Sequence, residues 1–191
     1  MTSECHRSPE DILLDAARDS ILAVGWKRTT LTDVARRAGV SRMTIYRSWS
    51  DMQSLLADLM TREWAGLVPA VEAGPAAGRL GRTVSETVRA MRGNDLFRKI
   101  LDVDPELLLP YLLDRRGRSQ DALLALLEAG IAEGQQDGSV RSGQPRLLAR
   151  AVVLAAHGFA LSAPTMAEDG GPTVDDLDAA LQDLVRRYLT P

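Results

Sequence analysis

The chain has 191 residues, of which 45% are hydrophobic and 26% charged, and its formal net charge at pH 7 is −3. These values are ordinary for a soluble globular protein of one or two domains. The single cysteine, Cys5, excludes an internal disulfide and fits a reducing cytosol. Because neither a secretory signal nor an apolar run of membrane-spanning length is apparent, we expect a cytoplasmic protein that does not contact a membrane.

The first predicted helix runs from Pro9 to about Val24. Ser8 is a suitable N-cap, Pro9 fits the first helical position, and Asp11 can complete a capping box. Gly25 ends the helix. The positions expected to face the core are Leu13, Ala16, Ala17, Ser20, Ile21 and Val24.

Residues 30–49 predict two short helices joined by a tight turn. Thr30 can cap the first helix, with Asp33 completing a capping box, and Ser41 can cap the second. Between them, Gly39 lies where a turn can need a positive φ. The first helix has apolar residues at i, i+3, i+4 and i+7, namely Leu31, Val34, Ala35 and Ala38. This pattern indicates a helix-turn-helix, whose second helix enters the major groove of DNA.

The second helix of this motif is predicted to have one buried and one outward face. At about 100° per residue, Ile45 and Trp49 point into the core, whereas Met43 and Arg47 lie almost opposite Ile45. The rest of the outward face is formed by Arg42, Thr44 and Tyr46. The alternative interpretation is an ordinary pair of packed helices with no role in DNA binding. The fully spaced stripe, the cap on both helices and the basic outward face favour DNA binding instead.

Positive charge is concentrated in the same stretch. Residues 26–50 hold six cations against one acid, a balance of +5, and the cations are Lys27, Arg28, Arg36, Arg37, Arg42 and Arg47. Five acids within residues 1–25 offset this charge inside the domain. The positive field is therefore local, which is how a chain of net negative charge can still bind DNA.

From about Ile12 to Met60, the sequence resembles the DNA-binding domain of TetR-type (tetracycline-repressor-like) transcriptional regulators. The resemblance rests on an apolar first helix ending near Gly25, then Thr-Leu-x-x-Val-Ala-x-x-Ala-Gly-Val-Ser, then Thr-Ile-Tyr with an aromatic residue at Trp49, then Leu55-Leu56. It implies an all-α fold. An N-terminal three-helix helix-turn-helix domain, residues 1–50, would join a C-terminal helical domain for ligand binding and dimerisation, residues 51–191.

The rest of the chain predicts helices and no strand. A connecting helix is expected at about residues 51–68, starting near Ser50 or Asp51, with Gln53 placed to complete a capping box from Ser50. Residues 70–82 are expected to form a loop. Further helices are expected at 83–92, 95–102, 105–115, 119–136, 145–163 and 174–189, the last capped by Thr173 with Asp176 at the capping-box position. Residues 164–172 are expected to form a Gly/Pro-rich loop.

The resemblance also implies roles for individual residues on double-stranded DNA. Base edges would be contacted by Arg42, Met43, Thr44 and Arg47, and phosphates by Thr30, Ser41, Tyr46 and Ser48. Thr32 would reach the edge of the groove. The sequence departs from the family at Met52, where members commonly carry a lysine that contacts a phosphate.

For the C-terminal domain, the resemblance implies a pocket for a small-molecule effector. The candidate lining is Met91, Phe97, Leu101, Leu108, Tyr111, Leu112, Leu127, His157 and Phe159. Ordinary core packing is the alternative for most of these residues, and a hydrogen-bonded core histidine is the alternative for His157. The last two helices are expected to form a homodimer through a four-helix bundle, although packing within one subunit would give the same periodicity.

The sequence thus favours a ligand-responsive regulator that binds a palindromic operator as a dimer. The resemblance favours a repressor, while activation stays open. Neither a catalytic motif nor a metal-ligand cluster is found, so no enzyme activity, cofactor or metal is expected. The three acids Asp175, Asp176 and Asp178 are attributed to capping and the helix dipole. The alternative function is a helical sensor or protein-interaction module that has lost sequence-specific DNA binding.

Overall fold

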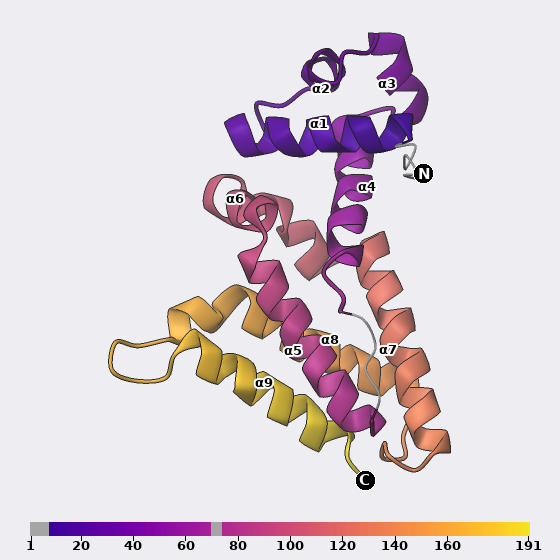
Figure 1. The fold of residues 1–191 in the computed structure, drawn as a ribbon, viewed down its shortest axis with the longest axis vertical. Coiled ribbons are helices and arrows are strands. Elements are labelled where there is room, and N and C mark those ends of the chain that lie inside the picture. Colours follow the sequence, from indigo (N-terminus) through magenta and orange to yellow (C-terminus); the bar gives the residue numbers. More distant parts are fainter. Residues whose placement is uncertain (1–7, 70–73) are drawn as a thin grey trace, which may run out of the picture. The chain divides into compact units, whose positions relative to one another are not determined.

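The computed structural model describes residues 8–69 and 74–191, and every regular element within these ranges is helical (Figure 1). This confirms the predicted all-α fold class. The α-helices are α1 (Pro9–Val24), α2 (Leu31–Arg37), α3 (Arg42–Ser48), α4 (Met52–Ala65), α5 (Ala76–Gly93), α6 (Asp95–Val103), α7 (Arg118–Gln136), α8 (Pro145–Met166) and α9 (Val174–Leu189). A 3-10 turn (Pro105–Leu107) and a π-helical turn (Pro110–Asp114) follow α6.

The chain divides into two compact units, and the first is not continuous in sequence. It comprises the chain up to Glu63 together with Asn94–Gly117, so α6 packs with α1–α4. Its core consists of fully buried apolar side chains, including Leu13, Ile21, Val34, Ile45, Leu55, Leu59, Leu96 and Ile100. The first unit therefore extends beyond the helix-turn-helix domain of residues 1–50 that the sequence predicts.

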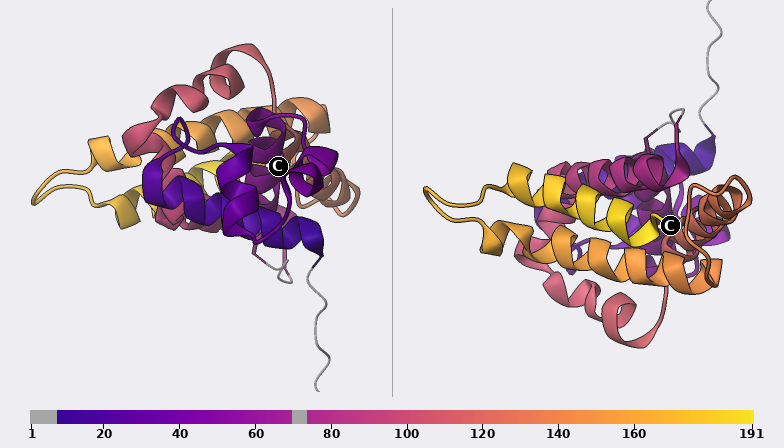
Figure 2. Two further views of the ribbon diagram at one scale, coloured as in Figure 1. Left: turned by 90° about the horizontal axis from the view of Figure 1, so that it is seen from above. Right: turned by 90° about the horizontal axis from the view of Figure 1, so that it is seen from below.

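The second unit comprises Trp64–Gly93 and Arg118–Pro191, with α5, α7, α8 and α9 around one apolar core. Helices α8 and α9 lie side by side as an antiparallel pair (Figure 2). Helices α5 and α9 lie close together at Gly81, where a Cβ atom would lie 2.8 Å from the backbone oxygen of Gln182. A side chain at Gly81 would push these two helices apart.

Three predicted boundaries are wrong. Helix α5 begins at Ala76 within the expected loop, because burial of Ala76, Ala77 and Leu80 outweighs the low helix propensity of the glycines around them. The segment after Pro105 is two short irregular turns, since Pro110 has no backbone N–H to continue an α-helix. Helix α8 continues through Pro164 to Met166.

The helix caps follow the sequence at Ser8 and Thr173 and differ in detail at Thr30 and at the start of α4. Capping boxes form at Ser8 with Asp11 and at Thr173 with Asp176. At Thr30, the hydroxyl donates to the Asp33 carboxylate, so the box is not reciprocal with the backbone. Helix α4 is capped by Asp51 rather than Ser50, because the Asp51 carboxylate accepts the Ser54 N–H at 2.7 Å.

Helix α8 reaches membrane-spanning length, contrary to the expectation from the sequence. It has 22 residues, and its most apolar 18-residue window has a mean hydropathy of 1.5. Such a helix is weak support for a membrane span, because the core helix of a globular unit passes the same test. Here α8 packs against α5, α7 and α9 within the second unit.

Candidate nucleic-acid interface

The turn between α2 and α3 is a short backbone-bonded connection. Gly39 has a φ of 70°, and the Val40 N–H donates to the Ala35 carbonyl at 3.0 Å. Nothing lies within 4 Å of a Cβ built at Gly39, so backbone conformation alone favours glycine there. On the far side of the turn, the Ser41 hydroxyl accepts the Thr44 N–H and caps α3. The sequence signals for this turn are confirmed.

Helix α3 is anchored on one side and open on the other. Ile45 is fully buried and Trp49 is 4% exposed, whereas Met43 is 79% and Tyr46 is 50% exposed. Arg42 and Arg47 are exposed as well. The outward face predicted from the helical period is therefore exposed, as a helix that enters the major groove of DNA requires.

The other predicted contact residues lie at the starts and ends of the same helices. Thr30, Ser41 and Ser48 are exposed, whereas Thr32 and Thr44 are half-buried. Thr44 shares a hydrogen bond of 2.9 Å with the Ser41 hydroxyl. All nine candidate residues therefore lie on α2, α3 or the residues that cap them, and their roles on DNA stay predictions.

Ion pairing separates the six cations of residues 26–50 into two groups. Lys27 pairs with Glu106, Arg36 with Asp33 at 2.8 Å, and Arg37 with Asp19 at 3.7 Å. Among the described residues, no acid pairs with Arg28, Arg42 or Arg47. These three guanidinium groups are exposed and open to an outside anion.

Arg28 was not singled out as a contact residue from the sequence. It lines an open hollow of about 350 Å³ between the end of α1 and helix α2, together with Thr29, Asp33, Arg36 and Arg37. The sequence feature that could have identified Arg28 is its position as a cation two residues before the N-cap of α2. Helix N-termini and nearby arginines together attract phosphate, so Arg28 is a further candidate for backbone contact.

The C-terminal end of α3 is fixed by a side-chain hydrogen bond to α4. The Trp49 indole N–H donates to the Asp58 carboxylate at 2.7 Å. Nearby, Met52 at the start of α4 is half-buried and packs against the core of the first unit. A helix of seven residues is not stable by itself, so the contacts of Ile45 and Trp49 fix the position and orientation of α3.

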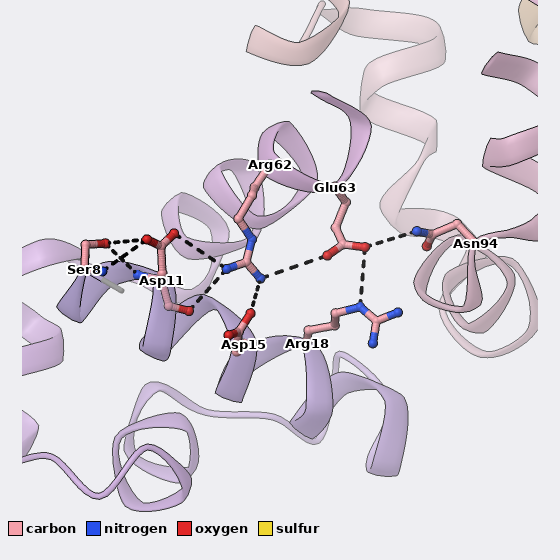
Figure 3. Close-up of polar contacts among 7 residues, drawn as sticks. All are labelled: Ser8, Asp11, Asp15, Arg18, Arg62, Glu63 and Asn94. Atoms are coloured by element: carbon pink, nitrogen blue, oxygen red, sulfur yellow. Dashed lines mark hydrogen bonds and ion pairs between the residues drawn. The ribbon is translucent and has the colours of Figure 1, made fainter. Parts of the chain in front are cut away.

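A polar network joins α1, α4 and the start of α6 within the first unit (Figure 3). The Glu63 carboxylate accepts from Arg18 at 3.4 Å and from the Asn94 side-chain amide at 3.0 Å. Arg62 pairs with Asp15 at 2.9 Å. These contacts hold the far end of α4 against α1.

The loop between α1 and α2 is tied to the end of α6. The Trp26 backbone N–H donates to the buried Asp104 carboxylate at 2.8 Å, and Lys27 pairs with Glu106. That ion pair raises the pKa of Lys27 and lowers the pKa of Glu106. The entry to α2 therefore depends on a residue far along the chain.

The nine predicted effector-pocket residues are divided between the two units. Phe97, Leu101, Leu108, Tyr111 and Leu112 belong to the first, and Met91, Leu127, His157 and Phe159 to the second. Leu127 is buried, with Met91 and Phe159 packed against the same core. His157 lies 3.5 Å from the Gln120 amide, and its burial lowers the pKa of its ring. The shared pocket stays a prediction.

Known proteins share the sequence pattern of this chain. The sequence profile of the bacterial regulatory proteins of the tetR family matches residues 13–59. An uncharacterized HTH-type transcriptional regulator of Mycobacterium tuberculosis is 37% identical over 152 residues, which cover 79% of each chain. The HTH-type transcriptional regulator AlkX of the same organism is 51% identical over 45 residues, 24% of this chain and 21% of AlkX.

The fold has a close counterpart among solved structures. The TetR family repressor AlkX from Dietzia sp., a protein implicated in biodegradation of n-alkanes, superposes with a TM-score of 0.68 at 22% identity. The match covers 95% of both chains.

Proposed function

This chain belongs to the tetR family of bacterial regulatory proteins and is a DNA-binding transcriptional regulator, and we propose that it is a repressor that binds a palindromic operator as a homodimer and releases it when a small-molecule effector binds. A cytoplasmic location goes with this proposal. The observation that carries it is the outward face of α3, where Arg42, Met43 and Arg47 are exposed while Ile45 and Trp49 fix the helix from behind.

In this proposal, some exposed side chains contact base edges and others contact phosphates. Arg42 and Arg47, which lack an acid partner among the described residues, would read guanine edges, and Met43 would contact a thymine methyl group. Arg28 and the hydroxyls of Thr30 and Tyr46 would hold phosphates. The test is a gel shift with DNA from upstream of the gene at several salt concentrations. A protein that has lost sequence-specific binding would show equal affinity for unrelated DNA.

Met52 offers a prediction about phosphate contacts. Met52→Lys is expected to tighten DNA binding and to steepen the salt dependence by roughly one unit per subunit, because the added ammonium group releases one more counterion. The methylene stem of lysine can keep the half-buried packing of Met52. Met52→Gln is the uncharged control and should leave the salt slope as it is. An unchanged slope for Met52→Lys would mean that the start of α4 does not approach the backbone.

A homodimer is supported by the surface of α8 and α9. Leu147 and Leu154 on α8 are 60% and 72% exposed, and Leu184 on α9 is also exposed. Large apolar side chains left exposed on two neighbouring helices favour an interaction site there. Two copies of the helix-turn-helix would then meet two half-sites of a palindrome, separated by about one turn of duplex, roughly 34–36 Å.

The effector part of the proposal predicts reciprocal weakening. An effector can shift the protein away from its DNA-binding state only by its difference in affinity for the two states, so operator and effector should weaken each other by the same factor. The candidate lining is mostly apolar, and a structural neighbour is implicated in n-alkane biodegradation, so long-chain n-alkanes are the first probes. Operator affinity is measured with and without probe, and probe affinity with and without operator. Simultaneous binding without mutual effect would reject release by that ligand.

A further inference from the structure

Helix α8 carries a row of residues whose size alternates along its outward face. The row is spaced by four and three residues in turn and reads Leu147, Ala151, Leu154, Gly158, Leu161 and Thr165. The opposite face of the same helix, including Ala149, Val152, Ala156 and Ala160, is buried in the core of the second unit. The alternation of large and small side chains therefore lies on the side that this chain does not cover.

Gly158 has no explanation within its own chain. It lies well inside a 22-residue helix, and nothing is within 4 Å of a Cβ built there. Three other helical glycines are crowded: Gly81 by the Gln182 backbone, Gly130 by Leu80 at 3.0 Å, and Gly134 by Val140. Gly78 and Gly93 are not crowded, but they lie in the first and last turns of α5. Glycine destabilises a helix interior relative to alanine, so an unneeded glycine here points to close approach from outside the chain.

Charge shows what kind of partner fits this face. Basic residues lie where α8 begins and α9 ends, and they include Arg146 together with Arg150, Arg186 and Arg187, which also pair with acids of their own chain. These two helix ends adjoin, because the Arg141 N–H donates to the Leu189 carbonyl at 2.8 Å. Acids lie where α8 ends and α9 begins, namely Glu168, Asp169, Asp175 and Asp176. A second copy laid antiparallel brings opposite charges together, whereas a parallel copy brings like charges together.

The same antiparallel arrangement also matches the side chains by size. When Leu154 of one copy faces Gly158 of the other, Ala151 faces Leu161 and Leu147 faces Thr165. Every large residue then meets a smaller one, and the pattern repeats by two-fold symmetry. A parallel copy would instead place leucine on leucine and glycine on glycine.

We propose that α8 pairs antiparallel with α8 of a second copy of this chain, with Leu154 of each copy packed on Gly158 of the other. This assignment rests on the proposed homodimer and adds its register. It makes Gly158 and Leu154 a size-matched pair that occurs twice in each dimer.

The test is an exchange of the two residues. Gly158→Leu is expected to raise the dimer dissociation constant at least about 100-fold, because two overpacked contacts form in each dimer. Leu154→Gly alone should also weaken the dimer. The double variant L154G/G158L restores one large and one small residue at each contact and should return to within about tenfold of the unaltered chain. Sedimentation over a concentration series gives the constants.

Folding is controlled separately. No atom of its own chain lies within 4 Å of a Cβ at Gly158, so circular dichroism of the single variant should match that of the unaltered protein. Should Gly158→Leu fail to fold, Gly158→Ala serves instead, since it favours the helix and should still weaken the dimer.

The outcomes separate the register from the dimer. If the unaltered chain is a dimer but the double variant is no better than the product of the single variants, the register is wrong and the proposed function stands. If the unaltered chain is monomeric at micromolar concentration, both the register and the homodimer are overturned. Binding of such a monomer to phosphatidylglycerol vesicles would assign the face to a membrane instead.

Discussion

Asp178→Ala is expected to lower the free energy of unfolding of the second unit by about 3–5 kcal/mol, the largest effect we expect from any single exposed or buried charge. Asp178 is 1% exposed, pairs with Arg92, and accepts from the Arg89 Nε–H at 3.0 Å. Its backbone carbonyl also accepts the Ser85 hydroxyl at 2.8 Å. Removing the carboxylate leaves the largely covered guanidinium of Arg92 without its counterion. Urea denaturation measures the loss.

The matched control is three residues earlier on the same helix. Asp175 also pairs with Arg89, at 3.2 Å, but its side chain is 84% exposed. Exposed pairs contribute about 0–1 kcal/mol, so Asp175→Ala should leave the denaturation midpoint almost unchanged. Equal effects of the two substitutions would show that burial of Asp178 is not what makes its ion pair matter.

Arg47→Ala is expected to weaken binding to the operator by about 1–3 kcal/mol, or roughly 5- to 150-fold, and to relax sequence preference at one position in each half-site. Arg47 is exposed on α3, opposite the buried Ile45, so its loss should not disturb the fold. Binding titrations against operators with single base changes measure both effects.

Two further substitutions are compared with Arg47→Ala. Arg98→Ala removes an exposed cation of the first unit that lies on α6, outside the helix-turn-helix, and should leave operator affinity unchanged. Tyr46→Phe removes a hydroxyl assigned to phosphate and should weaken specific and non-specific sites alike. If Arg47→Ala bound every operator variant as the unaltered protein does, the outward face of α3 would have been assigned wrongly.

The local features of the fold could be predicted from the sequence because they depend on neighbours in the chain. Ile45 and Trp49 are buried as the helical period requires, and Ser8, Ser41 and Thr173 cap helices within three residues of themselves. The start of α5 could not be predicted in this way. Its glycines argue for a loop, and only the packing against distant helices explains why the segment is helical.

The role of Asp178 was also beyond local reasoning. Its neighbours Asp175 and Asp176 fit the acidic first turn of a helix, and Asp176 does complete a capping box with Thr173. The hydroxyl of Thr173 accordingly lowers the pKa of the Asp176 carboxyl. Asp178, however, pairs with an arginine 86 residues away, and nothing in a single sequence indicates that pairing. The roles of individual side chains on DNA and on an effector are likewise set by partners outside the chain.

The tie between Trp26 and Asp104 bears on how this protein emerges from the ribosome. The residues it joins are 78 positions apart, and Leu96 and Ile100 complete the core that α1–α4 begin. During translation, part of the apolar core of the first four helices therefore stays exposed to solvent until α6 has been synthesised. In between, α5 is synthesised for the other unit. At this stage the cores of both units are incomplete, and their exposed apolar side chains are the surfaces that a chaperone would bind.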